Sequence, residues 1–146
     1  MEKLNIHADI SEAYRYMGGV GAPEEGVAAE LRRAAAIVEE TASARFIERF
    51  CEIDRAENLT LKGTGLVLEG SSIAALLHDC ERCVIFCVTI GSGLDALLRK
   101  WQLRDIAFAA MLDACASSAV ESLCNGIEAR LKDECGTQGL FLTDRF

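Results

Sequence analysis

The chain has few of the histidine side chains that catalytic sites commonly use. It contains two histidines, His7 and His78, and a single proline in 146 residues. Two imidazoles leave little scope for general acid–base catalysis by histidine. No Gly-x-Ser-x-Gly elbow is present, and neither histidine lies near a cysteine that would begin a helix after a strand. The sequence therefore does not predict an enzyme that works alone, and we assign no catalytic residue.

Positive charge is scarce as well. The chain has 15 Lys and Arg against 23 Asp and Glu, a net charge of −8. Without a basic stripe to neutralise phosphates, we expect no nucleic-acid partner. No apolar run approaches the ~20 residues of a membrane span, and residues 1–7 lack the apolar stretch of a signal peptide. We expect a cytoplasmic protein that does not bind membranes.

Cysteine, by contrast, is abundant, with seven residues. An odd number without a secretion signal fits a reducing compartment. The one Cys-x-x-Cys motif, Cys80–Cys83, lacks the second ligand pair that a zinc site needs, and it leads from a helix into a strand rather than the reverse. We expect the thiols to be reduced, free of metal and packed as small buried hydrophobes. Five of them sit in apolar runs: Cys51, Cys83, Cys87, Cys115 and Cys124.

Composition and periodicity predict one compact α+β domain over residues 1–146. An apolar content of 51% is enough for a substantial core. Apolar residues at helical spacing predict helices at 10–17 after an Asp9 cap, 24–43, 71–78 after a Ser71 or Ser72 cap, 94–101 and 105–133. Long helices among strands that do not alternate regularly with them favour a mixed or antiparallel sheet packed against helices.

Five segments have the pattern of strands. They are residues 3–7, 46–53, a hairpin of 59–61 with 66–68, residues 84–90 and residues 140–146. The 84–90 run is apolar on both faces, which is typical of a central strand. Gly91-Ser92-Gly93 joins that strand to a helix, where backbone N–H groups could bind an anion or could simply form a tight turn.

The longest predicted helix carries polar residues at a spacing of four. Asp113, Ser117 and Glu121 share one face, among Ala, Cys, Leu, Met and Val at the other positions. One interpretation is a stripe that faces water. The other is the edge of a cleft, where carboxylates could meet a sulfonium, an amine or ribose hydroxyls. Tyr14 and Tyr16, on the first helix, are expected to pack that helix against the sheet.

Four short segments, in order along the chain, resemble one known family. Residues 11–18 (SEAYRYMG) resemble its opening Arg-Tyr-Leu-Gly-Tyr element, and residues 84–91 resemble an apolar strand that ends in Thr-Ile-Gly. Residues 113–121 resemble an Asp-Ala-x-Gly-Ser-x-x-x-Glu helix, with Ala116 where the family often has glycine. Residues 139–146 resemble the entry into its cofactor motif. The family is the activation domain of cobalamin-dependent methionine synthase.

The resemblance implies a binding module rather than a methyltransferase in its own right. Such a domain binds S-adenosylmethionine and presents it to cobalamin, which a flavodoxin-type donor reduces. The chain lacks an Asp-x-His-x-x-Gly signature, so the cobalamin would belong to a partner. The resemblance assigns Glu121 and Arg145 to the cofactor, with Asp113 as a weaker candidate.

The sequence ends at Phe146, where the family continues into a Ser-Pro-Gly-Tyr-Gly-Asp-type loop. We therefore expect a C-terminally incomplete site with S-adenosylmethionine binding on the order of millimolar, or about −4 kcal/mol. The alternative is a non-catalytic scaffold or oligomerisation domain that has lost the site. An uncovered strand edge and apolar surface would favour a homo-oligomer, at least a dimer.

Overall fold

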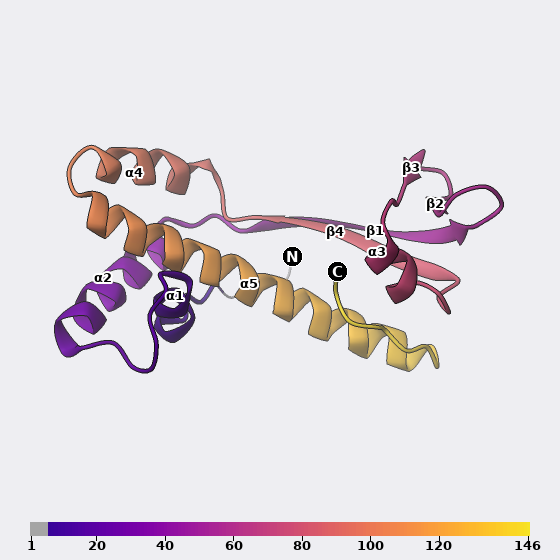
Figure 1. Ribbon diagram of the computed structural model, residues 1–146, viewed down its shortest axis with the longest axis horizontal. Coiled ribbons are helices and arrows are strands. Elements are labelled where there is room, and N and C mark those ends of the chain that lie inside the picture. The colour runs from indigo at the N-terminus through magenta and orange to yellow at the C-terminus, as the bar shows by residue number, and fades with distance from the viewer. Residues whose placement is uncertain (1–5) are drawn as a thin grey trace. The chain divides into compact units, whose positions relative to one another are not determined.

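The computed structural model describes residues 6–146, which form an α+β fold of two compact units (Figure 1). Unit 1 comprises the described residues up to Arg45 together with Val88–Ala129. Unit 2 comprises Phe46–Cys87 and Arg130–Phe146. Unit 2 is therefore largely an insertion in the sequence of unit 1.

Unit 1 is built from helices. They are α1 (Ile10–Tyr16), α2 (Glu25–Thr41), α4 (Ser92–Gln102) and the part of α5 (Ile106–Thr137) that precedes Arg130. Figure 1 shows α1, α2 and α4 gathered around this first part of α5. The sequence predicted all four helices to within a few residues, because each has both an apolar stripe and a recognisable end.

The core of unit 1 lies between α2 and α5. Leu31 and Val38 on α2 and Leu112 and Ala119 on α5 are fully buried. The small side chains of α5 let its backbone approach the neighbouring helices closely. Burying each large aliphatic side chain contributes about 2 kcal/mol to folding, so this cluster supplies much of the stability of unit 1.

A buried serine ties the first helix to the last. The Asp9 carboxylate caps α1 by accepting from the backbone N–H groups of Ser11 and Glu12, as predicted. The backbone N–H of Asp9 donates to Ser118 Oγ at 2.8 Å, and Ser118 Oγ donates to the Asp9 carbonyl at 3.1 Å. One side chain on α5 thus satisfies both backbone groups of the α1 cap.

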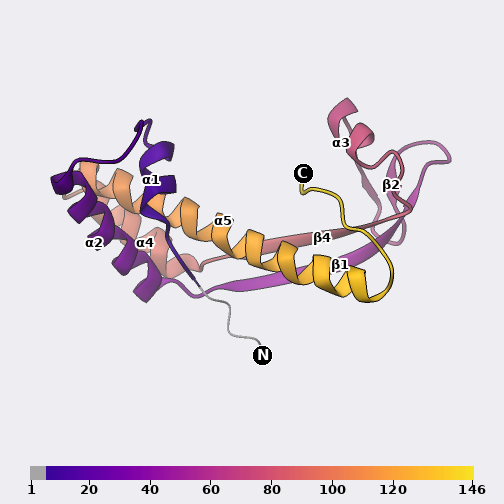
Figure 2. The same cartoon turned by 90° about the horizontal axis from the view of Figure 1, so that it is seen from below.

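Unit 2 contains most of a four-stranded antiparallel sheet and one short helix. The elements are β1 (Arg45–Asp54), β2 (Thr60–Leu61), β3 (Leu66–Val67), α3 (Ser71–Leu76) and β4 (Arg82–Thr89), with strand order β3-β2-β1-β4. β1 pairs with β2 at Ile53 and Leu61, and β2 pairs with β3 to form the predicted hairpin. Figure 2 shows α3 at the same end of the sheet as β2. Leu77, just after α3, completes a small core with Cys51, Ile53 and Leu61.

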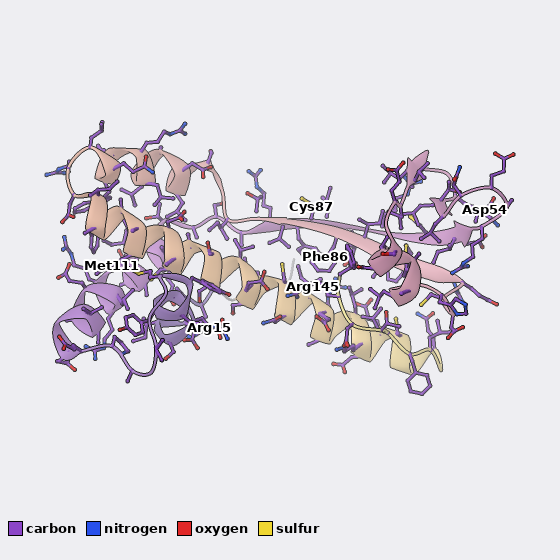
Figure 3. All side chains as sticks on the ribbon, in the orientation of Figure 1. Arg15, Asp54, Phe86, Cys87, Met111 and Arg145 are labelled. Atoms are coloured by element: carbon purple, nitrogen blue, oxygen red, sulfur yellow. The ribbon has the colours of Figure 1, made fainter. Side chains whose placement is uncertain are left out.

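The prediction that residues 84–90 form a central strand was wrong in its placement. The strand exists as β4, but among residues 6–146 it is an edge strand whose only neighbour is β1. Its residues alternate between exposed and half-buried, and adjacent Phe86 and Cys87 point to opposite faces (Figure 3). Apolar residues on both faces of the predicted strand indicated that both faces are buried, but one face of this sheet is open at Ile85 and Cys87.

Three other local predictions differ from the structure. Residues 140–146 follow α5 without forming a strand, since no described strand pairs with them. The residue that caps α3 is Gly70, at φ 119°, and Ser71 is already helical. The predicted strand at 3–7 lies partly outside the described residues, and its described residues, Ile6 and His7, are not in a strand.

Among the described residues, α5 is the one helix that could cross a membrane by length and composition. Half of its most apolar stretch is buried against the rest of the chain. A core helix of a soluble protein satisfies the same criteria, so this property alone assigns no membrane role to α5.

Candidate functional site

The polar stripe on α5 lies where the spacing placed it. Asp113, Ser117 and Glu121 are all exposed, whereas Leu112 and Cys115 on the same helix are buried. This exposure fits both interpretations of the stripe, a water-facing surface and the edge of a binding site. The surrounding residues decide between them.

Two of the three stripe residues line an open hollow in unit 1. The hollow has a volume of about 500 Å³ and is lined by Tyr16 from the end of α1 and by Ser117, Val120 and Glu121 from α5. We call these four residues the α1–α5 hollow. It combines an aromatic ring, an aliphatic side chain, a hydroxyl and a carboxylate. That combination suits a small organic cation or a ligand with hydroxyl groups.

Tyr16 is the last residue of α1, and the chain turns tightly just after it. The backbone N–H of Gly19 donates to the Tyr14 carbonyl at 2.9 Å, and the chain turns at Gly18 with φ 86°. A Cβ on Gly19 would lie 2.4 Å from the Tyr14 ring, so any other residue here would require that ring to move. Tyr14 packs against the core of unit 1, whereas Tyr16, two residues on, is 45% exposed. The prediction that both rings pack α1 against the sheet was wrong, because Tyr14 packs against a core of helices and Tyr16 is exposed.

The Tyr16 hydroxyl lies close to negatively charged side chains. The pKa of Tyr16 is raised above its ordinary value of 10.0 by partial desolvation and by the carboxylates of Glu12 and Glu121. A hydrogen bond with Arg15 (labelled in Figure 3) opposes this shift, and Arg15 also pairs with Glu12. The Arg15 guanidinium lies 5.8 Å from the Tyr16 ring centroid and pairs with Glu12, so Glu121 supplies the remaining negative charge that favours a cationic ligand.

We expect the Tyr16 phenol to titrate above its ordinary pKa. In a Tyr14→Phe chain, which leaves one phenol, the ultraviolet titration midpoint should lie above 10, and Glu12→Gln with Glu121→Gln should lower it. Since the folded pKa is the higher one, Tyr16 contributes stability below about pH 10 that is lost as the pH rises through the folded value. An unchanged midpoint in the doubly substituted chain would contradict this electrostatic account.

The other two candidates from the sequence lie outside the hollow. Asp113 is exposed on the same face of α5 but does not line it. Arg145 belongs to unit 2, in the exposed segment that follows α5 (labelled in Figure 3). The structure therefore joins Glu121 to Ser117, Val120 and Tyr16, rather than to Asp113 and Arg145. Helical spacing could have shown that Tyr16 faces away from Tyr14, but not that it meets α5 at the hollow.

Gly91 forms a tight strand-to-helix turn. It has φ 92°, its N–H donates to Thr89 Oγ1 at 3.1 Å, and a Cβ there would lie 3.2 Å from Ser43. Both properties account for glycine at this position without a ligand.

The cysteines differ in exposure more than the sequence suggested. Cys51 and Cys115 are buried, but Cys87, which was expected in the core, is exposed. Burial raises the pKa of the Cys115 thiol to about 11, with a smaller contribution from the charge of Glu39. Cys115 is therefore a packing residue with low nucleophilicity at neutral pH.

Comparison with known proteins adds no assignment to this geometry. No protein-family model matches the chain, and no curated protein matches it.

Proposed function

We propose that the chain is a binding module of the methionine synthase activation type, in which the α1–α5 hollow takes S-adenosylmethionine. The module would present this cofactor to cobalamin on a partner, with an electron donor of the flavodoxin type, and would carry no catalytic residue itself. The observation that carries the proposal is the meeting of Glu121 with the exposed Tyr16 ring around one hollow.

The chemistry of the hollow fits this ligand. S-adenosylmethionine carries a sulfonium cation beside a ribose and an adenine ring. The Tyr16 ring, which already has the Arg15 guanidinium 5.8 Å from its centroid, can stack on the adenine, and Val120 offers apolar contact. The Glu121 carboxylate can accept from the ribose hydroxyls or attract the sulfonium, and Ser117 supplies a further hydroxyl. A volume of about 500 Å³ lies within the usual range for small-molecule sites, roughly 300–1,000 Å³.

The openness of the hollow limits the expected affinity. One wall formed by two helices leaves much of a ligand in water, and exposed carboxylates attract cations weakly through solvent. A dissociation constant on the order of millimolar follows, about −4 kcal/mol. Arg145 and Asp113, which the resemblance also assigned to the cofactor, are not needed for this minimal contact set.

Calorimetric titration tests the proposal. We expect saturable binding of S-adenosylmethionine to the 146-residue chain, and weaker binding of S-adenosylhomocysteine, which has the same rings but no sulfonium charge. Glu121→Gln should remove most of the preference for the charged ligand, because it keeps the side-chain shape and removes the charge. Asp113→Asn is the matched control on the same helix face, and it should change little.

Two results of this titration would contradict the proposal. One is flat traces with S-adenosylmethionine at millimolar concentration. The other is equal affinity for the two ligands in the native chain, which would show that the carboxylate does not recognise the sulfonium.

A second candidate function, a scaffold that self-associates, is favoured by the surface of unit 2. β4 is an edge strand with Ile85 exposed, and the neighbouring β1 exposes Ile47 and Phe50. An edge and apolar side chains together favour pairing with another copy. Light scattering should then give a dimer that Ile47→Lys with Phe50→Lys converts to monomer. A clean monomer at high concentration would remove this candidate and leave the cofactor proposal untouched.

A further inference from the structure

Unit 2 brings three thiols to one small core. Cys51 lies on β1, Cys83 lies on β4, and Cys80 lies between α3 and β4. Cys51 is buried in the cluster formed with Ile53, Leu61 and Leu77, and Cys80 and Cys83 pack against that same cluster while remaining partly exposed. Nothing in the proposed cofactor function uses these residues.

The pairing of β1 with β4 places two of the thiols opposite each other. The two strands are neighbours in the antiparallel sheet, and the N–H of Ile53 donates to the Glu81 carbonyl at 2.9 Å. In an antiparallel pair, one step back along one strand corresponds to one step forward along the other. Two steps from the Ile53–Glu81 pair therefore place Cys51 opposite Cys83.

Opposed residues in such a pair can reach the geometry of a disulfide. Their Cα atoms lie about 5.5 Å apart in a hydrogen-bonded pair, and disulfides span Cα separations of roughly 4.4–6.8 Å. The electrostatics agree with this proximity. Burial raises the pKa of the Cys83 thiol, and the neighbouring Cys51 and Cys80 raise it further.

We propose that Cys83 and Cys51 form a reversible disulfide with a low-molecular-weight disulfide, of the oxidised glutathione type, as the oxidant. The Cys83 thiolate attacks one sulfur of the oxidant, which gives a mixed disulfide and releases one small thiol. Cys51 then attacks the Cys83 sulfur and releases the second small thiol. The two cysteines lose two electrons, the oxidant's S–S bond gains them, and the two thiol protons leave on the released thiols.

The difference in burial sets this order. Cys83 is partly exposed and can meet the oxidant, whereas Cys51 is 5% exposed and can react only with a sulfur already beside it. Because the thiolate is the attacking species and the Cys83 pKa is raised, the first step is slow at neutral pH and accelerates as the pH rises. The product would link β1 to β4 covalently and close the edge of the small core.

The test is a disulfide map of the whole 146-residue chain. The native protein is incubated with oxidised glutathione, free thiols are alkylated, and the peptides are identified by mass spectrometry. We expect a linked Cys51–Cys83 peptide pair that a reducing thiol reverses, and faster formation at higher pH. Cys51→Ser should leave the mixed disulfide on Cys83, and Cys87→Ser, at an exposed position on the same strand, should still give the link.

The opposing outcomes are equally specific. A map in which Cys83 is linked to Cys80, or in which glutathione stays on Cys83 of the native chain, would overturn the proposal. So would an unmodified Cys83 after exhaustive treatment at alkaline pH. Should Cys51→Ser fail to fold, as judged by circular dichroism, the map of the unsubstituted chain still decides the matter.

Discussion

Leu112→Ala should lower the free energy of unfolding of unit 1 by about 3 kcal/mol. The Leu112 side chain is fully buried on α5 and packs in the same cluster as Leu31 and Val38 of α2. Truncation removes the transfer free energy of its methyl groups and leaves a cavity that two well-packed helices cannot close. Against a total stability of roughly 5–15 kcal/mol for a typical domain, this is a large loss.

Fluorescence offers a measurement specific to unit 1. The only tryptophan, Trp101, lies in that unit and packs on Phe108 with ring centroids 4.5 Å apart. Urea unfolding followed by Trp101 emission therefore reports the core that Leu112 belongs to. Leu103→Ala is the matched control, because Leu103 is 90% exposed in the same unit and should cost under about 0.5 kcal/mol. Equal midpoints for the two variants would mean that the core is not where the structure places it.

Arg130→Met should destabilise unit 2 by about 2 kcal/mol. The Arg130 guanidinium donates to Glu48 on β1 and, at 2.7 Å, to Glu134 one turn further along α5, and it lies 5.3 Å from the Phe46 ring centroid. The hydrogen bond to Glu48 is the main cause that raises the pKa of Arg130. The side chains of Arg130 and Glu48 are only 26% and 23% exposed, so the substitution leaves a poorly solvated carboxylate without its partner.

The expected destabilisation by Arg130→Met lies between the values for exposed and for buried ion pairs. Exposed ion pairs contribute about 0–1 kcal/mol, and breaking a fully buried pair costs roughly 3–5 kcal/mol. Lys62→Met is the control in the same unit, since the Lys62–Glu52 pair is more than half exposed on both sides and should cost under about 0.5 kcal/mol. Hydrogen exchange of the β1 amides measures the loss of stability in both variants. Arg130→Met is expected to speed exchange well beyond Lys62→Met, and similar rates in the two variants would show that the cluster is ordinary surface.

Most of the fold could be predicted because its signals are local. The Asp9 carboxylate caps α1 through residues two and three positions away, and the stripe from Val27 to Val38 on α2 needs only its own spacing. The fold class follows from the same periodicities. In the candidate site, Ser117 and Glu121 were found for this reason, since a spacing of four on one helix fixes their common face.

The predictions that were wrong concern segments whose place in the fold depends on contacts with residues distant in the sequence. β4 is apolar at nearly every position, but its place at the edge is set by which strands pair with it. Residues 140–146 have strand-forming composition but no described strand beside them. Tyr16 reaches the hollow because α5 lies next to the end of α1, and helical spacing alone does not predict which helices are neighbours.

The link between Asp9 and Ser118 also bears on the order in which the protein can form. Its two ends are separated by 109 positions along the chain. As the polypeptide leaves the ribosome, the Asp9–Ser118 link cannot form until α5 has emerged, by which time β1, β2 and β3 have all been synthesised. Their turns join near neighbours, whose closure costs little entropy. We therefore expect the sheet to organise early and unit 1 to close late, with the rate of maturation set by the long-range encounter of α1 with α5.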